Sequence, residues 1–474
     1  MNLGESVLGW MGRAVALGTL TVLLCSCGEK FKYFERRVDL TEIEKSLSDR
    51  TLKDDIPSDK LEESGYKGEW PPITWGLEEF MVASLFFSPS IDLAKENLKK
   101  SLISAEISAQ HSPISLEVTA EHHQKALAGE RPWGLGMALA LPIVTKNKRQ
   151  ALSDRAALYA DNARLALAQK SWDLRSALRD NLISLRISDK RLSIASQRYV
   201  LAQKILDLLE ARLRAGYISD GEYEIASLET SKFKSQFEQE KISSEKFKIA
   251  ISRIAGLPIK EVLSLRFNWE FLSKFQMENS SQSYRKYALR NRIDLHALII
   301  DYGAADADFR IQISNQYPQI SLSPGYLWDQ GDGIWSLVGA IIPPANIKEQ
   351  VMEAELQRSV MEKKVIELQS TIQSEIDSNY MSLKNALSAD VASNQEIRER
   401  LKVLDRQRVN FEEGKISRLD LYRERMLLLN AYDKGVQAEQ ELLIAISSLE
   451  DACQVPFIGG SLLPDFRIPM ELVN

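Results

Sequence analysis

The sequence predicts a mainly α-helical protein with a small membrane-crossing β part. We expect several copies to assemble so that their long helices form a tube continuous with a β-barrel. Three observations support this fold class in the 474-residue chain. Two very long stretches contain no proline or glycine, two segments alternate as strand hairpins do, and both features recur about 200 residues apart, as an internal two-fold repeat.

The first long stretch, residues 146–214, predicts one helix of roughly 69 residues and about 100 Å. Its apolar residues follow two different seven-residue series. These are Leu178, Leu185, Leu192, Tyr199, Leu206 and Leu213 in one, and Ile187, Ile194, Leu201 and Leu208 in the other. A single coiled-coil seam needs only one series, so we expect neighbouring helices on both sides. Residues 347–413 form the corresponding stretch of the second half.

Four segments have the period of two that is typical of strands. In the first half, a helix over residues 75–110 precedes strands at 114–121 and 133–141, with their hairpin turn at 126–132. In the second half, strands at 320–328 and 334–342 are joined by a turn at 329–333. Each segment has roughly the length of a tilted membrane strand, which is about 9–11 residues.

The repeat is clearest at two glycine turns. Arg214-Ala215-Gly216-Tyr217-Ile218-Ser219 corresponds to Glu412-Glu413-Gly414-Lys415-Ile416-Ser417, 198 positions later. Asp207 and Asp405, and also Pro258 and Pro456, share this spacing. The predicted division is a signal peptide (1–26), a lipid-anchored extended arm (27–72), repeat 1 (73–258, hairpin 113–143, turn 215–219), a connector (259–285), repeat 2 (286–456, hairpin 318–343, turn 413–417) and a tail (457–474).

The N-terminus reads as a bacterial lipoprotein leader. Arg13 precedes the apolar run 14–24, which is too short for a permanent membrane helix. Leu24-Cys25-Ser26-Cys27 resembles a lipobox, which implies acylation of Cys27 and, with Gly28 next, anchoring in the outer membrane. An ordinary secretory signal with incidental cysteines is the alternative. The remaining Cys453 is expected to be a buried, unreactive thiol.

Four strands are too few to close a membrane barrel, because natural barrels begin at about eight. Open sheet edges are not tolerated in lipid. The chain must therefore oligomerise if its strands cross a membrane.

This arrangement resembles outer-membrane efflux proteins of the TolC type, over roughly residues 75–456, and their lipid-anchored branch in particular. The resemblance implies a homotrimer with a 12-stranded barrel in the outer membrane of a Gram-negative cell. It implies the exit duct of a tripartite efflux pump that passively conducts drugs, metal ions or other small molecules from periplasm to exterior. The implied partners are a periplasmic adaptor protein and an inner-membrane transporter. The Phe and Gly that many relatives carry after the segment 141–143 are missing here.

The same resemblance suggests functional residues. The two turns look like the family's periplasmic tips, which makes Gly216, Tyr217, Ile218 and Ser219, with Gly414, Lys415, Ile416 and Ser417, the candidate adaptor contacts. The glycines also suit a positive φ and the serines a helix N-cap in any helical hairpin. Asp405, nine residues before Gly414, is similar in position to a gate aspartate and would form a carboxylate ring; the alternative is an ordinary solvated charge.

Other functions find little support in the sequence. A net charge of −6 gives no electrostatic case for nucleic acid. No catalytic, cofactor-binding or metal motif stands out, and His122 and His123 are adjacent on a strand and so face opposite sides. We therefore expect no enzyme, no cofactor and no metal. Two alternatives stay open: a type I protein secretion duct of the same fold, and a lipid-anchored periplasmic coiled-coil scaffold.

Overall fold

The computed structural model describes residues 33–459, except 36, 52–55, 57–60, 62–65, 67, 110–113, 125–131, 274, 279 and 330–331. The chain forms two units, Met1–Asp49 and Arg50–Asn474. The predicted leader, Cys27 and most of the C-terminal tail lie outside the described residues.

Within the first unit, one short helix is described. Helix α2 (Leu40–Ser48) begins at Asp39, whose side chain accepts hydrogen bonds from the backbone N–H groups of Thr41 and Glu42. The sequence predicts an extended arm in this region, and for these residues that prediction is wrong. The helix is indicated by the N-cap residue and by the helical spacing of Leu40, Ile43 and Leu47, although the periodicity is weak.

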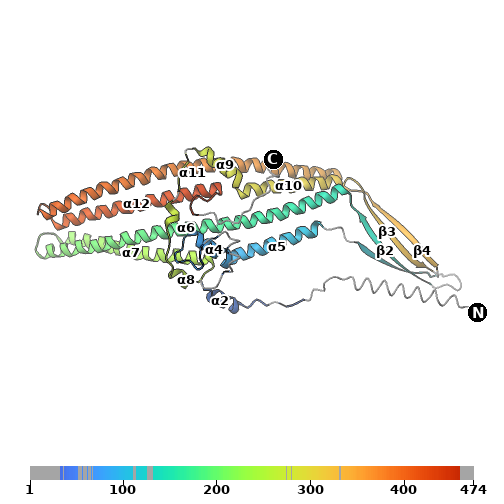
Figure 1. Ribbon diagram of the computed structural model, residues 1–474, viewed down its shortest axis with the longest axis horizontal. Helices are drawn as coiled ribbons and strands as arrows, with labels where there is room; N and C mark the ends of the chain where they lie inside the picture. The colour runs from blue at the N-terminus through green and yellow to red at the C-terminus, as the bar shows by residue number, and fades with distance from the viewer. Residues whose placement is uncertain are drawn as a thin grey trace, which may run out of the picture. The chain divides into compact units, whose positions relative to one another are not determined.

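The second unit contains long helices and four strands (Figure 1). In chain order they are α4 (Leu77–Phe87), α5 (Pro89–Ala109), β1 (Ser115–His122), β2 (Trp133–Ile143), α6 (Lys146–Arg214), α7 (Asp220–Ala255), α8 (Ile259–Leu263), η1 (Glu270–Ser273), α9 (Ser281–Asn291), α10 (Ile293–Ser314), β3 (Gln319–Asp329), β4 (Asp332–Ile342), α11 (Ile347–Glu412) and α12 (Arg418–Cys453). The prediction of one uninterrupted helix over 146–214 is confirmed, and its counterpart ends one residue earlier than expected.

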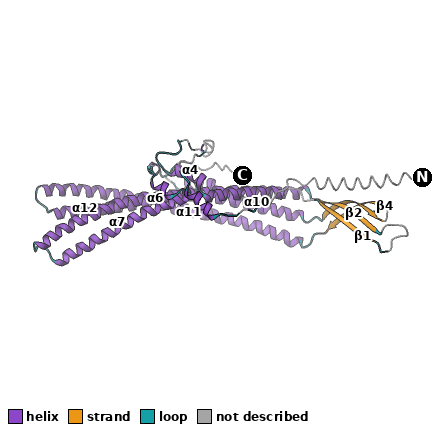
Figure 2. Cartoon of the chain, turned by 90° about the horizontal axis from the view of Figure 1, so that it is seen from below, coloured by secondary structure: helices purple, strands orange, loops and turns teal. Residues whose placement is uncertain are grey.

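The helices of the second unit lie side by side in rows of four, in which each helix contacts the next. In the half that carries the glycine turns, the row is α7–α6–α12–α11, and in the half next to the strands it is α5–α6–α10–α11. The strands continue this order as one antiparallel sheet, β1–β2–β3–β4, as Figures 1 and 2 show. One edge of every row therefore belongs to the first half of the chain and the other edge to the second half.

The two apolar series of α6 face different neighbours, as predicted. Leu178 and Leu185 join a core with residues of α4 and α7. Ile187 and Ile194 instead pack with Val436 and other residues of α12. A third core lies between α9, α11 and α12 and contains Cys453. The double seam thus marks a helix with partners on two sides.

The single leading helix predicted for each half is wrong, because each is broken into two. Helix α4 ends before Ser88, which has extended backbone angles and precedes Pro89. A residue before proline is disfavoured in the α region, so the sequence contained this signal. Helices α9 and α10 break at Arg292, which is extended without a following proline. There the Arg292 side chain pairs with Asp294 and Glu375.

Candidate functional surfaces

The two glycine turns have the same backbone geometry. Gly216 and Gly414 both have φ of +75°. The N–H of Tyr217 donates to the carbonyl of Arg212 at 2.9 Å, and that of Lys415 to Asn410 at 2.8 Å. These bonds close each long helix, and the positive φ explains why glycine stands at both positions.

Serine caps the helix that follows each turn. Ser219 Oγ accepts from the N–H of Glu222, and Ser417 Oγ from that of Asp420, both at 3.3 Å. In the second turn Asp420 also accepts from the backbone N–H of Ser417, at 3.1 Å, which completes a capping box. The predicted structural roles of the glycines and serines are therefore confirmed.

The side chains of the two turns differ in chemistry. Tyr217 is 81% exposed at the first turn. Its counterpart Lys415 pairs with Glu413 at 2.5 Å. The two turns therefore share one backbone shape, but the first exposes an aromatic ring and the second carries an ion pair.

Asp405 lies on α11 with an exposed side chain. Its neighbours one turn away along the helix include Lys402 and Val409, and Arg406 follows it directly. Its repeat counterpart Asp207 is exposed on α6. Asp405 is therefore accessible on the surface of the chain, close to both basic and acidic side chains, because Lys402 pairs with Glu399.

The sheet has one apolar and one mainly small or polar face. Directly paired residues point to the same side, and the register pairs Val118 with Met137, and Met137 with Tyr326. The apolar face consists of Leu116, Val118, Ala120, His122, Trp133, Leu135, Met137, Leu139, Leu141, Ile143, Ile320, Leu322, Pro324, Tyr326, Trp328, Gly333, Trp335, Leu337, Gly339 and Ile341. Trp335 is 83% and Leu337 70% exposed on it. The opposite face carries Glu117, Thr119, Ser323 and Ser336 among glycines and alanines, and it also carries the larger apolar residues Leu327, Ile334, Val338 and Ile342.

A buried network of ion pairs joins Arg175 and Arg179 of α6 to Glu450 and Asp451 of α12. Glu450 Oε1 accepts from Arg175 and, at 2.7 Å, from Arg179, while Glu450 Oε2 accepts from the N–H groups of Phe457 and Ile458 at 2.8 Å. Arg179 also donates to Asp451 at 2.6 Å. Arg175, Arg179 and Glu450 are at most 1% exposed.

Charge pairing outweighs burial in this network. Burial disfavours the charged guanidinium, but the hydrogen bond to Asp451 and the carboxylates of Glu450 and Asp451 raise the pKa of Arg179. Sequence reasoning missed these residues. The available signal was the pair Arg175 and Arg179, spaced by one helical turn among the apolar positions Leu174, Leu178 and Leu182.

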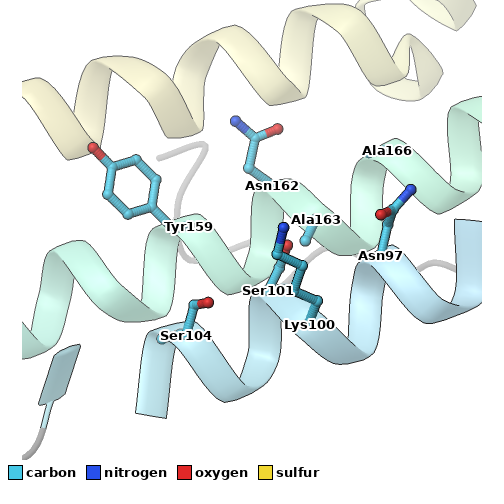
Figure 3. A pocket seen from close by; sticks show the side chains of 9 residues that line it. Asn97, Lys100, Ser101, Ser104, Tyr159, Asn162, Ala163 and Ala166 are labelled. Atoms are coloured by element: carbon cyan, nitrogen blue, oxygen red, sulfur yellow. The ribbon is translucent and has the colours of Figure 1, made fainter. Parts of the chain in front are cut away.

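A cleft of about 520 Å³ lies between α5 and α6 (Figure 3). It is lined by Asn97, Lys100, Ser101, Ser104, Ala105, Tyr159, Asn162, Ala163 and Ala166. Asn162 donates to Asp301 of α10 at 2.6 Å, which fixes its amide. None of these lining residues is a carboxylate, histidine or cysteine, and the polar ones are asparagine, serine, lysine and tyrosine.

The two adjacent histidines point to opposite faces of the sheet. His122 contacts Trp133 on the apolar face, with ring centroids 4.6 Å apart. His123 Nε2 lies 2.8 Å from Asp329 Oδ1 on the other face. Among the described residues, no group of three or more His, Cys, Asp or Glu side chains is suited to hold a metal ion.

Cys453 is buried in the α9–α11–α12 core, as predicted. Burial raises the pKa of its thiol to about 12.

Among the described residues, no helix combines the length and the apolar character that spanning a membrane requires.

Solved structures similar to this chain include an outer membrane protein and several outer-membrane channels. The outer membrane protein VceC of Vibrio cholerae aligns with a TM-score of 0.66 at 16% identity, over 82% of this chain and 100% of VceC. The CmeC channel of Campylobacter jejuni gives 0.65 at 13% identity, over 90% of this chain and 93% of CmeC. The open MtrE channel of Neisseria gonorrhoeae gives 0.62 at 16% identity, over 80% and 89%.

These similarities establish the fold. The predicted resemblance and the predicted class, long helices with a small four-stranded sheet and a repeated order of elements, are confirmed. No protein-family model matches the sequence, and no curated protein matches it.

Proposed function

We propose that this protein is the outer-membrane channel of a tripartite efflux pump, a passive duct for small molecules rather than an enzyme. In this proposal three copies associate, and their sheets join edge to edge in the outer membrane. The long helices extend the duct into the periplasm. Acylated Cys27 anchors each copy in outer-membrane lipid.

The sheet carries this proposal most directly. Its apolar face suits lipid, and its opposite face, on which small and polar residues outnumber large apolar ones, suits a water-filled interior. A soluble coiled-coil scaffold has no use for a sheet that exposes Trp335 and Leu337 to water. This observation favours the duct over the scaffold.

The glycine turns support the proposed partners. Both turns lie at the end of the helices away from the sheet (Figure 1), and their side chains, such as Tyr217, are exposed. We propose that residues 216–219 and 414–417 contact a periplasmic adaptor, which connects the duct to an inner-membrane transporter. Asp405 is proposed to narrow the duct close to these turns.

Planar-bilayer conductance of the purified protein, with its trimer state verified beforehand, tests the proposal. We expect discrete steps, larger in Asp405→Ala than in the unmodified channel. Asp207→Ala is the matched control and is expected to leave the steps unchanged. Steps that Asp405→Ala does not alter would retain the duct and remove the gate assignment. A verified trimer that never conducts, in either form, would contradict the duct.

A further inference from the structure

A second cleft, of about 870 Å³, lies between α6, α11, α12 and the connector that follows α8. Its lining runs along α12 from Ile446 to Tyr432, which is about 21 Å. The rings of Trp269, Phe275 and Tyr432 line it and are half-buried. Grooves lined by aromatic rings bind extended, proline-containing segments, which favour the polyproline II conformation. The cleft therefore suits a segment of that kind.

The described chain reaches the rim of this cleft after α12. Phe457 packs on Phe275, with ring centroids 5.9 Å apart. The next residue, Ile458, is fixed by hydrogen bonds to the buried network of ion pairs. Residues 460–474 follow and lie outside the described residues. Six residues span up to about 20 Å, so position 463 is within reach of the cleft.

The sequence after this point has a period of three. Leu463, Phe466, Pro469 and Leu472 recur at every third position. A polyproline II helix has three residues per turn, so in that conformation these four side chains form one apolar side. Pro464 and Pro469 favour it, because proline is excluded from helix interiors and also disfavours helical angles at the residue before it.

Two charged residues flank the middle of this apolar side. Asp465 precedes Phe466 and Arg467 follows it. With three residues per turn, the two charged side chains point to opposite flanks of the segment, about 6 Å apart along its axis. The cleft carries Arg186 on α6 and Asp390 on α11. These helices form opposite walls, because α12 lies between them in the row. Each flank of the segment thus has a wall of opposite charge.

The levels of the two wall charges also fit. Three ion pairs join residues at nearly equal sequence distances from the two turn glycines: Arg198–Asp433, Lys190–Glu439 and Lys434–Glu396. Equal distances therefore mean equal levels. By this rule the arginine of the α6 wall lies six positions further from the turns than the aspartate of the α11 wall, which is about 9 Å. A segment that enters at the Phe275 rim meets the arginine first and the aspartate second, in the order in which it carries its own acid and base.

We propose that residues 463–469 bind in this cleft of their own chain as a polyproline II segment. The apolar side rests on the aromatic rings, and Asp465 and Arg467 pair with Arg186 and Asp390. Attachment at the rim favours this occupant over a free partner, because a short connection gives a high effective concentration. The segment ties α6 of the first half to α11 and α12 of the second half. The inference goes beyond the proposed function, since it requires neither conduction nor a second copy.

Alkylation of Ser193→Cys, in the lining of the cleft, tests the binding in the full-length protein. Phe466→Asp should speed this labelling about fivefold or more, because it removes the central apolar contact and opens the cleft to the reagent. Ile468→Asp is the matched control, since position 468 lies off the apolar side, and should change the rate less than about twofold. Labelling of Ser235→Cys on α7, outside the cleft, should not change. Equal effects of the two acids, or no effect of Phe466→Asp, would overturn the proposal.

Charge exchange tests the flanks of the segment. Asp465→Arg should speed labelling of Ser193→Cys by about two- to fivefold, because it replaces an opposite-charge pair with two like charges. Adding Arg186→Asp should restore the original rate. Glu471→Arg, outside residues 463–469, is the control and should leave the rate unchanged. If Arg186→Asp does not restore the rate, the pairing is wrong.

Disulfide formation identifies the occupant. Positions 465 and 468 lie on the same flank of the segment, so Ile468→Cys should reach Ser193→Cys, seven positions after Arg186 on the same wall. Arg467→Cys with Ser193→Cys is the control, because position 467 faces the other wall. We expect a disulfide within one chain from the first pair only, seen as monomer in non-reducing electrophoresis and as joined peptides in mass spectrometry.

Each other outcome of the disulfide experiment contradicts the proposal. A disulfide between two chains would assign the cleft to a second copy. No disulfide would leave the cleft to a different partner, and equal yields from the two pairs would remove the polyproline II register. None of these results would affect the proposed duct, because the experiment measures a contact within one chain.

Discussion

Glycine is required at two positions because the backbone there is left-handed. A Cβ at Gly216 or Gly414 would meet nothing within 4 Å, so space does not explain either residue. The positive φ alone does. The strain of placing a side chain in that region is about 1–2 kcal/mol.

Gly216→Ala should therefore loosen the first turn without unfolding the protein. We expect the Tyr217 amide, which donates to Arg212, to exchange its hydrogen about five- to tenfold faster. Gly221→Ala is the control, since Gly221 lies inside α7 without a positive φ and alanine favours helix there. Slower or unchanged exchange in Gly216→Ala would show that the turn tolerates the strain.

Cys453 should resist alkylation in the folded protein. Burial holds its pKa near 12, so almost no thiolate exists at pH 8.5. The peptide that contains Cys453 should remain unmodified by iodoacetamide until denaturant is added, as measured by mass spectrometry. The raised pKa also means that the stabilisation from the buried thiol is complete below about pH 9, the ordinary value, and is lost as pH rises toward 12. Rapid labelling at pH 8.5 without denaturant would contradict this burial.

At the scale of elements, the ion network decides how α6 and α12 meet. Glu450 and Asp451 together balance the charges of two buried arginines, and Glu450 also accepts hydrogen bonds from two N–H groups of the chain after α12. Removing a single partner from such a group leaves a buried charge unpaired, which costs more than the pair contributes.

Glu450→Gln should lower the free energy of unfolding by about 3–5 kcal/mol. Glu439→Gln is the matched control on the same helix. It breaks a pair with Lys190 that is about one-third exposed and should cost about 1 kcal/mol or less. Thermal or chemical unfolding followed by circular dichroism measures both variants. Similar losses in the two variants would mean that the buried network is solvated.

At the scale of the whole molecule, the two faces of the sheet distinguish lipid from water. Val118 and Thr119 are neighbours on β1, and their side chains point to opposite faces. Both are exposed in the single chain.

Val118→Arg should impair assembly in membranes, whereas Thr119→Arg should have little effect. An arginine in the middle of the lipid-facing surface costs about 2–4 kcal/mol, and one on the interior surface does not. The yield of trimers after refolding into phospholipid vesicles measures the difference. Equal yields from the two variants would indicate that neither face meets lipid.

Local pattern alone determined most elements. The 69-residue helix α6 follows from a stretch without proline or glycine, the strands from alternation, and the turn geometry from glycine and serine at matching positions. These features depend on residues near in sequence. The break between α4 and α5 also had a local signal, because Pro89 disfavours helical geometry at the residue before it, but the sequence-based prediction did not use this signal.

Only the tertiary structure decided which distant residues meet. The network of Arg175, Arg179, Glu450 and Asp451 joins residues from opposite halves of the chain, and no local pattern pairs them. The same holds for the order of the rows, which places α7 and α11 at opposite edges. Helix and strand formation depends on periodicity along the chain, whereas burial and charge pairing depend on which surfaces the folded chain brings together.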